Sequence, residues 1–205
     1  MCMGRVIRRI GFLILILLAV ILLGFTLFRV RMDPVLSSLA KSKAAAETSR
    51  LITQAVTRKI SQGDLSYERL ICFEKDFEGR VTALKTNMQQ VNLLKGSILR
   101  ELNRDIMKID QGKIGIPLGD LIFPELFSGI GPNIPVRILS VRRSGADFTS
   151  DFTQAGINQT LHRLRMQVKV EGTILVLGKI QTFSASGSVL VAETVIVGQV
   201  PHTFS

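Results

Sequence analysis

One stretch near the amino terminus constrains this chain more than any other. Residues 10–28 are 19 consecutive side chains without a charge, and arginines stand on both sides of the run. A helix rises about 1.5 Å per residue, so the run nearly spans the roughly 30 Å hydrocarbon core of a bilayer. A charged side chain at its centre would cost about 3 kcal/mol to insert, and the run has none. The sequence therefore predicts a transmembrane helix over 10–28, in contact with membrane lipid.

The flanks of this run indicate an uncleaved anchor and its orientation. A secretory signal peptide has an apolar stretch of about 7–15 residues followed by small side chains, whereas bulky and charged residues follow here at 26–31. The tail over 1–9 carries three arginines and no acid, while Asp33 dilutes the positive charge on the other side. Since positive tails stay inside, we expect a single-pass cell-membrane protein with its amino terminus in the cytoplasm and its carboxy-terminal domain outside.

The composition of the residues after position 28 limits which kinds of domain and which binding partners are expected. The 177 residues after position 28 (205 minus 28) suffice for one domain with its own core. Cys2 and Cys72 lie on opposite sides of the predicted membrane, so no disulfide framework is expected, and the apolar neighbours of Cys72 predict a buried thiol. The net charge is +10, but the chain has no Trp and one Tyr, and it lacks aromatic–basic interleaving. Nucleic acid is therefore not an expected partner.

Asp33-Pro34 predicts the start of a second helix, with Asp33 as its N-cap. This helix is expected to end near Gln62, before Gly63. Its first half is small and polar, which predicts little burial, whereas its second half repeats apolar residues at helical spacing. We interpret 29–63 as a juxtamembrane stalk helix that merges into an extracytoplasmic domain over 64–205.

The domain itself alternates helical and strand patterns. A hairpin is predicted from 70–75 and 80–85, and a second long helix from Asn87 to just before Gly112. Residues 161–171 alternate apolar and polar side chains, as in a half-buried antiparallel strand. Further strands are predicted over 135–141, 146–152, 173–177, 180–184 and 189–197. The predicted fold class is α+β, with two long helices packed on a mainly antiparallel sheet.

Few residues carry a recognisable chemistry. The two histidines, His162 and His202, have no partners at zinc-ligand spacing, so neither a metal nor a cofactor is expected. Gly129-Ile130-Gly131-Pro132 lacks the remaining residues of a phosphate-binding loop and predicts a turn. His162 lies on the apolar face of its strand, which favours a hydrogen-bonded core histidine over a catalyst.

The densest polar string is Gly156-Ile157-Asn158-Gln159-Thr160-Leu161-His162. Two adjacent amides after a glycine can fix a turn through side-chain to backbone hydrogen bonds. The same amides can present donors and acceptors to a ligand. Both interpretations are open, with the turn-forming role preferred.

Several strings resemble the YunB-type sporulation proteins of endospore-forming Firmicutes. They are Ile116-Pro117-Leu118-Gly119, Gly129-Ile130-Gly131-Pro132, Phe152 with Ala155 to His162, and Ala192-Glu193-Thr194-Val195-Ile196-Val197-Gly198-Gln199-Val200-Pro201. The resemblance covers essentially the whole chain, including the anchor and the helix after it. It implies a role in spore formation with expression in the mother cell, and it brings no enzymatic activity, cofactor or catalytic residue.

The leading hypothesis is a non-enzymatic, membrane-anchored sporulation protein in the mother-cell or outer forespore membrane. It would bind an envelope protein or a wall polymer through loops carried on a rigid scaffold. The contact candidates are Gly156, Asn158, Gln159, Thr160, His162, Gly129, Gly131, Pro132 and Glu193. One alternative is an envelope enzyme acting on peptidoglycan or another wall polymer, with His162, Glu193 and Asp151 as acid–base groups. Another is a basic domain drawn to anionic lipid or wall polymer by charge alone.

Overall fold

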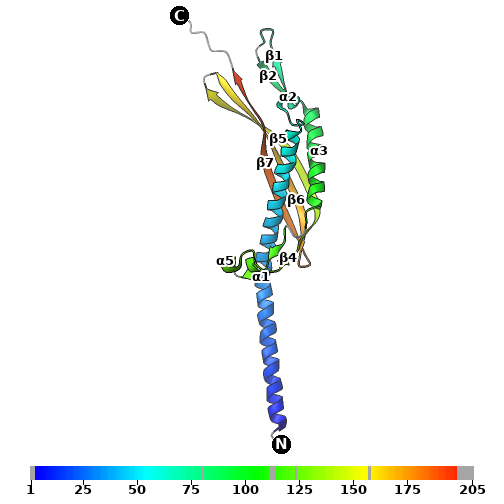
Figure 1. The fold of residues 1–205 in the computed structure, drawn as a ribbon, viewed down its shortest axis with the longest axis vertical. Coiled ribbons are helices and arrows are strands. Elements are labelled where there is room, and N and C mark those ends of the chain that lie inside the picture. The colour runs from blue at the N-terminus through cyan, green and yellow to red at the C-terminus, as the bar shows by residue number, and fades with distance from the viewer. Residues whose placement is uncertain (1–2, 80, 111–113, 123, 157, 198–205) are drawn as a thin grey trace.

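The structure is a computed structural model that describes the backbone of residues 3–79, 81–110, 114–122, 124–156 and 158–197, with side chains throughout except at 3–14, 25, 27–30 and 81. Three long antiparallel strands form its main sheet, in the order β5-β6-β7: Val136–Gly156, Gln159–Val176 and Lys179–Val197. Two helices, α1 (Met3–Ser61) and α3 (Met88–Met107), lie along the sheet (Figure 1). The predicted α+β class with an antiparallel sheet is confirmed.

Helix α1 is one continuous helix of 59 residues, so the predicted helix start at Asp33-Pro34 is wrong. A proline inside a helix leaves one carbonyl without its partner, at a cost of about 3 kcal/mol. Contacts with the domain hold this turn in place, because Asp33 accepts a hydrogen bond from the Lys179 ammonium and Leu36 is buried. The carboxy-terminal end agrees with prediction, since the helix ends at Ser61 and Gly63 has a φ of +75°.

The carboxy-terminal half of α1 packs on the sheet with one row of side chains. Ala55 is buried beside this row. Most of the fully or nearly fully buried residues recur every fourth position: Leu36, Ala40, Ala44, Thr48, Ile52 and Val56. The prediction that the first half of this stretch would be little buried is therefore wrong. Small side chains are buried there because they let the helix backbone approach β7 closely. At Gly187 the approach is so close that an added Cβ would lie 2.8 Å from Cγ2 of Ile52.

The three long strands replace six shorter ones in the prediction. β6 buries every second residue from His162 to Val176, as its alternation predicted. β5 and β7 run through positions where breaks were expected, because register shifts absorb the irregular residues. These shifts lie between Ile138 and Ser140, Val141 and Arg143, Gln154 and Gly156, and Leu164 and Arg165.

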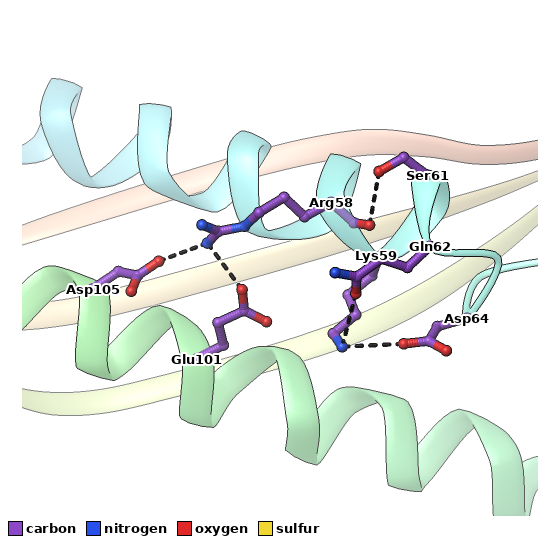
Figure 2. A network of polar contacts seen from close by, with 7 residues as sticks. All are labelled: Arg58, Lys59, Ser61, Gln62, Asp64, Glu101 and Asp105. Carbon is purple, nitrogen blue, oxygen red and sulfur yellow. Dashed lines mark hydrogen bonds and ion pairs between the residues drawn. The ribbon is translucent and has the colours of Figure 1, made fainter.

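Helix α3 follows the predicted pattern and contacts both α1 and β5. Its N-cap is Asn87, whose side chain accepts a hydrogen bond from the Gln90 amide at 3.2 Å. Arg58 of α1 joins the two helices on their exposed side, where it contacts Glu101 at 3.1 Å and Asp105 at 2.6 Å (Figure 2). The helices are thus held by a buried apolar seam and a surface ion-pair cluster.

A short helix, α2 (Tyr67–Leu70), leads into a separate two-stranded hairpin of β1 (Ile71–Lys75) and β2 (Val81–Thr86). The hairpin was predicted, but Cys72 within it is an exposed free thiol, so the expected burial is wrong. Cys72 is exposed because the two-stranded hairpin is separate from the main sheet and buries few of its own side chains. After Ile71, the side chains of β1 are exposed.

The glycine- and proline-rich segment forms a compact loop that directly precedes the first residue of β5. It contains β3 (Ile116–Pro117), α4 (Gly119–Ile122), α5 (Pro124–Phe127) and β4 (Asn133–Ile134), and β3 pairs with β4. This agrees with the prediction of an ordered loop with short strands.

The amino-terminal half of α1 extends away from the body of the protein (Figure 1). Among the residues that the structure describes, no helix combines the length and apolar character needed to cross a bilayer. The predicted anchor over 10–28 lies partly outside the described side chains. Within that span the described large apolar side chains between Leu15 and Leu23 are 42–66% exposed.

Candidate functional site

His162 is the centre of a buried polar chain that links three elements. Its side chain is 1% exposed, with Nε2 lying 2.5 Å from Ser150 Oγ and Nδ1 lying 2.6 Å from Tyr67 Oη. Tyr67 belongs to α2, Ser150 to β5 and His162 to β6, so the imidazole joins the α2 segment to the sheet. The prediction of a hydrogen-bonded core histidine is confirmed.

Burial keeps this imidazole neutral. Desolvation lowers the pKa of His162 below its ordinary value, while the negative charge of Asp151 opposes that shift. Burial also raises the pKa of Tyr67, so its hydroxyl keeps its proton. A neutral ring donates from one nitrogen and accepts at the other, and both hydroxyls can serve either role. Both nitrogens of the His162 ring therefore have hydrogen-bond partners while the ring is uncharged.

Aromatic rings surround the same histidine. Phe152 stacks on it with ring centroids 4.4 Å apart and planes 14° apart, and Tyr67 meets it edge-on at 5.6 Å. Phe152 is nonetheless 55% exposed. One face of its ring packs on a buried residue while the remainder is accessible, so Phe152 connects the core to the surface.

The polar string beyond Phe152 forms the β5–β6 turn. Gly156 pairs with Gln159, and Asn158 has a φ of +60°, a left-handed conformation that asparagine tolerates better than most residues. The backbone of Asn158 therefore shapes the turn. A shallow hollow lies over the hairpin, lined by Phe152, Thr153, Gln154, Gly156, Asn158, Gln159 and Thr160. The structure thus places four of the predicted contact residues on one surface, which we call the hairpin tip.

The candidates Gly129, Gly131 and Pro132 lie elsewhere, in the loop at the opposite end of the main sheet (Figure 1). Gly129 donates its N–H to Asp120 at 2.7 Å, and this hydrogen bond is the main reason that the pKa of Asp120 is lowered. Pro132 accepts from the Leu118 amide at 3.1 Å. With φ values of +74° and +101°, the two glycines close the loop. Their contacts give them a structural role.

The acid–base groups of the enzyme alternative are not assembled into one site. Glu193 accepts a hydrogen bond from Arg163 Nε at 2.6 Å, and Asp151 is the cross-strand neighbour of Arg163. Arg163 follows His162 on β6, so these acids project from the face of the sheet opposite His162. Among the residues described, no group of three His, Cys, Asp or Glu side chains is placed to hold a metal ion.

The sequence does not predict which residues contact His162, and the reason is physical. Tyr67 is 95 residues away along the chain, and no local pattern connects it with His162. Ser150 and Phe152 share one face of β5 because they are two residues apart, but their register against β6 depends on bulges. A strand alternation shows which residues share a face, whereas it does not show what lies across from them.

Comparison with known proteins connects this architecture to sporulation. Residues 113–203 match the family described as Sporulation protein YunB. The chain is also similar to Sporulation protein YunB of Bacillus subtilis (strain 168), with 23% identity over 172 residues that cover 78% of this chain and 68% of the relative. No solved structure gives a significant match. The family suggests a role in sporulation. These matches confirm the resemblance to the YunB-type sporulation proteins that the motifs predicted.

Proposed function

We propose that this chain is a membrane-anchored, non-enzymatic sporulation protein whose domain binds a partner of the spore envelope with its hairpin tip. The family supports the sporulation part of the proposal. The separation of His162 from Glu193 and Asp151 by the plane of the sheet supports a binding role over hydrolysis.

The anchor is supported by the uncharged run over 10–28 and by its surroundings. No described part of the domain covers α1 between Leu15 and Leu23, where apolar side chains project on all sides. In water such a surface is unfavourable by about 25 cal/mol per Å² of apolar area, and lipid removes that cost. The arginines of the tail orient the domain outward, which places it outside the mother cell or between the two membranes around the forespore.

The hairpin tip is the observation that carries the binding role. It combines a rigid base, in which Phe152 stacks on buried His162, with an exposed rim of amide and hydroxyl groups. Aromatic rings flanked by adaptable polar groups suit protein and carbohydrate surfaces, because the ring supplies contact area and the rim supplies hydrogen bonds. The partner class is therefore an envelope protein or a wall polymer.

The chain offers a matched pair of dipeptides for testing this role. Gln159-Thr160 lies in the hairpin tip, and the same dipeptide recurs at Gln181-Thr182 on β7, near the other end of the sheet. We expect Gln159→Ala with Thr160→Ala to lower the count of heat-resistant spores in a deletion strain, at unchanged protein level. Gln181→Ala with Thr182→Ala should restore spores fully. Equal complementation by both double variants would refute binding through the tip.

A further inference from the structure

The turn between β6 and β7 carries side chains that folding does not require. Val176 pairs with Lys179, so Leu177 and Gly178 form a two-residue hairpin loop, with φ values of +45° and +78°. Such turns favour asparagine, aspartate or glycine, because a side chain with a Cβ is disfavoured in the left-handed conformation. Leu177 is 58% exposed, and Ile180 beside it is 65% exposed. Two large apolar side chains therefore face solvent at a turn where a polar residue would fold more easily.

The position of this turn beside α1 explains why its apolar side chains are exposed. The Lys179 ammonium donates to the carboxylate of Asp33, which fixes the turn against the helix. Asp33 follows the end of the uncharged run, Phe28, by five residues, or about 7.5 Å along the helix axis. A bilayer of about 40–45 Å around a core of about 30 Å has a headgroup layer of about 5–8 Å on each side. The turn thus lies at headgroup depth when residues 10–28 span the core.

We infer that the β6–β7 turn is a second membrane contact, in which Leu177 and Ile180 enter the lipid interface beside the anchor. This inference rests on the proposed anchor. Apolar side chains at the turn contact the upper acyl chains, and the nearby cation Arg31 faces lipid phosphates. Together with α1, the turn would fix the tilt and rotation of the domain over the membrane, and so the direction in which the hairpin tip projects.

Depth-dependent quenching in vesicles tests this contact with the full chain. Cys2 and Cys72 are replaced by serine, and an environment-sensitive dye is attached to one new cysteine at a time. The vesicles contain phosphatidylcholine and phosphatidylglycerol, with quenching groups placed shallow or deep on the acyl chains. The reporter is Leu177→Cys, the control within the anchor is Leu18→Cys, and the control far from the membrane is Phe77→Cys, at the turn of the β1–β2 hairpin.

We expect shallow quenchers to act on position 177, deep quenchers on position 18 and neither on position 77. Quenching at 18 without quenching at 177 overturns the lipid contact and leaves the anchor intact. Quenching at neither position overturns both. A dye at 177 that is shielded from water but is reached by neither shallow nor deep lipid quenchers indicates a protein contact or a second copy, which also overturns the inference.

A substitution separates the lipid role of Leu177 from any folding role. Leu177→Asn suits the left-handed conformation, so unfolding of the full chain in detergent should occur at the same temperature or higher. With the dye at Ile180→Cys, the same substitution should reduce quenching by shallow lipids. A lower unfolding temperature would show that Leu177 serves the fold. Unchanged quenching would show that Leu177 does not hold the turn in the membrane, and it would overturn the inference.

Discussion

Tyr67 Oη lies 2.6 Å from Nδ1 of His162, and this hydrogen bond joins residues that are 95 apart in the sequence. It ties the α2 segment, and through it the β1–β2 hairpin, to the middle strand of the main sheet. On the other side of the ring, Ser150 Oγ completes the chain at 2.5 Å. The base of the proposed binding surface is therefore held by polar contacts inside an apolar core, which makes it sensitive to single substitutions.

Tyr67→Phe should lower the free energy of unfolding by about 1–3 kcal/mol, because it leaves Nδ1 of His162 buried without a partner. Chemical denaturation of the full chain in detergent measures this loss. The ring packing against Phe73, with centroids 5.7 Å apart, is retained in the variant. Ser150→Ala is the comparison, and its cost should be smaller because Ser150 lies in an exposed part of β5. An unchanged stability in Tyr67→Phe would contradict a structural role for this hydrogen bond.

Stability should fall as the pH is lowered through the histidine range. The pKa of His162 is lower in the folded protein than its ordinary value of 6.5, because burial penalises the charged ring. The unfolded chain therefore binds a proton first, and stabilisation by the neutral ring is lost as the pH drops below about 6.5. Thermal unfolding at pH 7.5 and 5.5 measures this effect. His162→Gln should flatten the difference, whereas an equal pH dependence in that variant would assign the effect to other groups.

The close approach of α1 to β7 predicts a steric cost at Gly187. Gly187→Ala places a Cβ 2.8 Å from Cγ2 of Ile52, which should lower the free energy of unfolding by about 1–3 kcal/mol. Gly145→Ala is the matched control, since it meets no atom within 4 Å and should change stability little. Ile52→Ala combined with Gly187→Ala should cost less than the sum of the single variants. Additive costs would show that the two residues do not compete for the same space.

Arg58→Ala should cost less than about 1 kcal/mol, although Arg58 contacts both Glu101 and Asp105 (Figure 2). Its side chain is 47% exposed, and water screens the ion pairs. Denaturation at low and high salt measures this contribution, and the difference between wild type and variant should shrink as salt rises. A large loss that is insensitive to salt would mean that the stem of Arg58 contributes more through packing than its charge does.

Local sequence patterns predicted much of the fold. They failed where contacts between distant segments determine the bounds of an element or its burial. The alternation of β6 identified its buried face, and Asn87 and Gly63 marked helix ends correctly. Asp33-Pro34 wrongly predicts a helix start, because a contact that holds the proline inside α1 comes from the distant Lys179 and has no signal in the local sequence. The small residues of α1 wrongly predict little burial, because their burial depends on how closely β7 approaches the helix.

The candidate site divides in the same way. The string from Gly156 to His162 stands out by its composition. The structure places Asn158, Gln159 and Thr160 around one shallow hollow, whereas His162 is buried and is not a surface contact. Gly129, Gly131 and Pro132 were grouped with them by sequence, yet they lie at the other end of the sheet. Glu193 was paired with His162 on chemical grounds, whereas its partner in the structure is Arg163.

The sequence by itself determined the uncharged run over 10–28, the start of α3, the inward face of β6 and the resemblance to the YunB-type family, because each depends on neighbouring residues or on short strings. The tertiary structure alone decided which residues surround His162, how far α1 is buried, and that the β6–β7 turn is bonded to Asp33. These features depend on strand register and on the distance between packed elements. Both are set by contacts among residues far apart in the chain, and no local pattern records them.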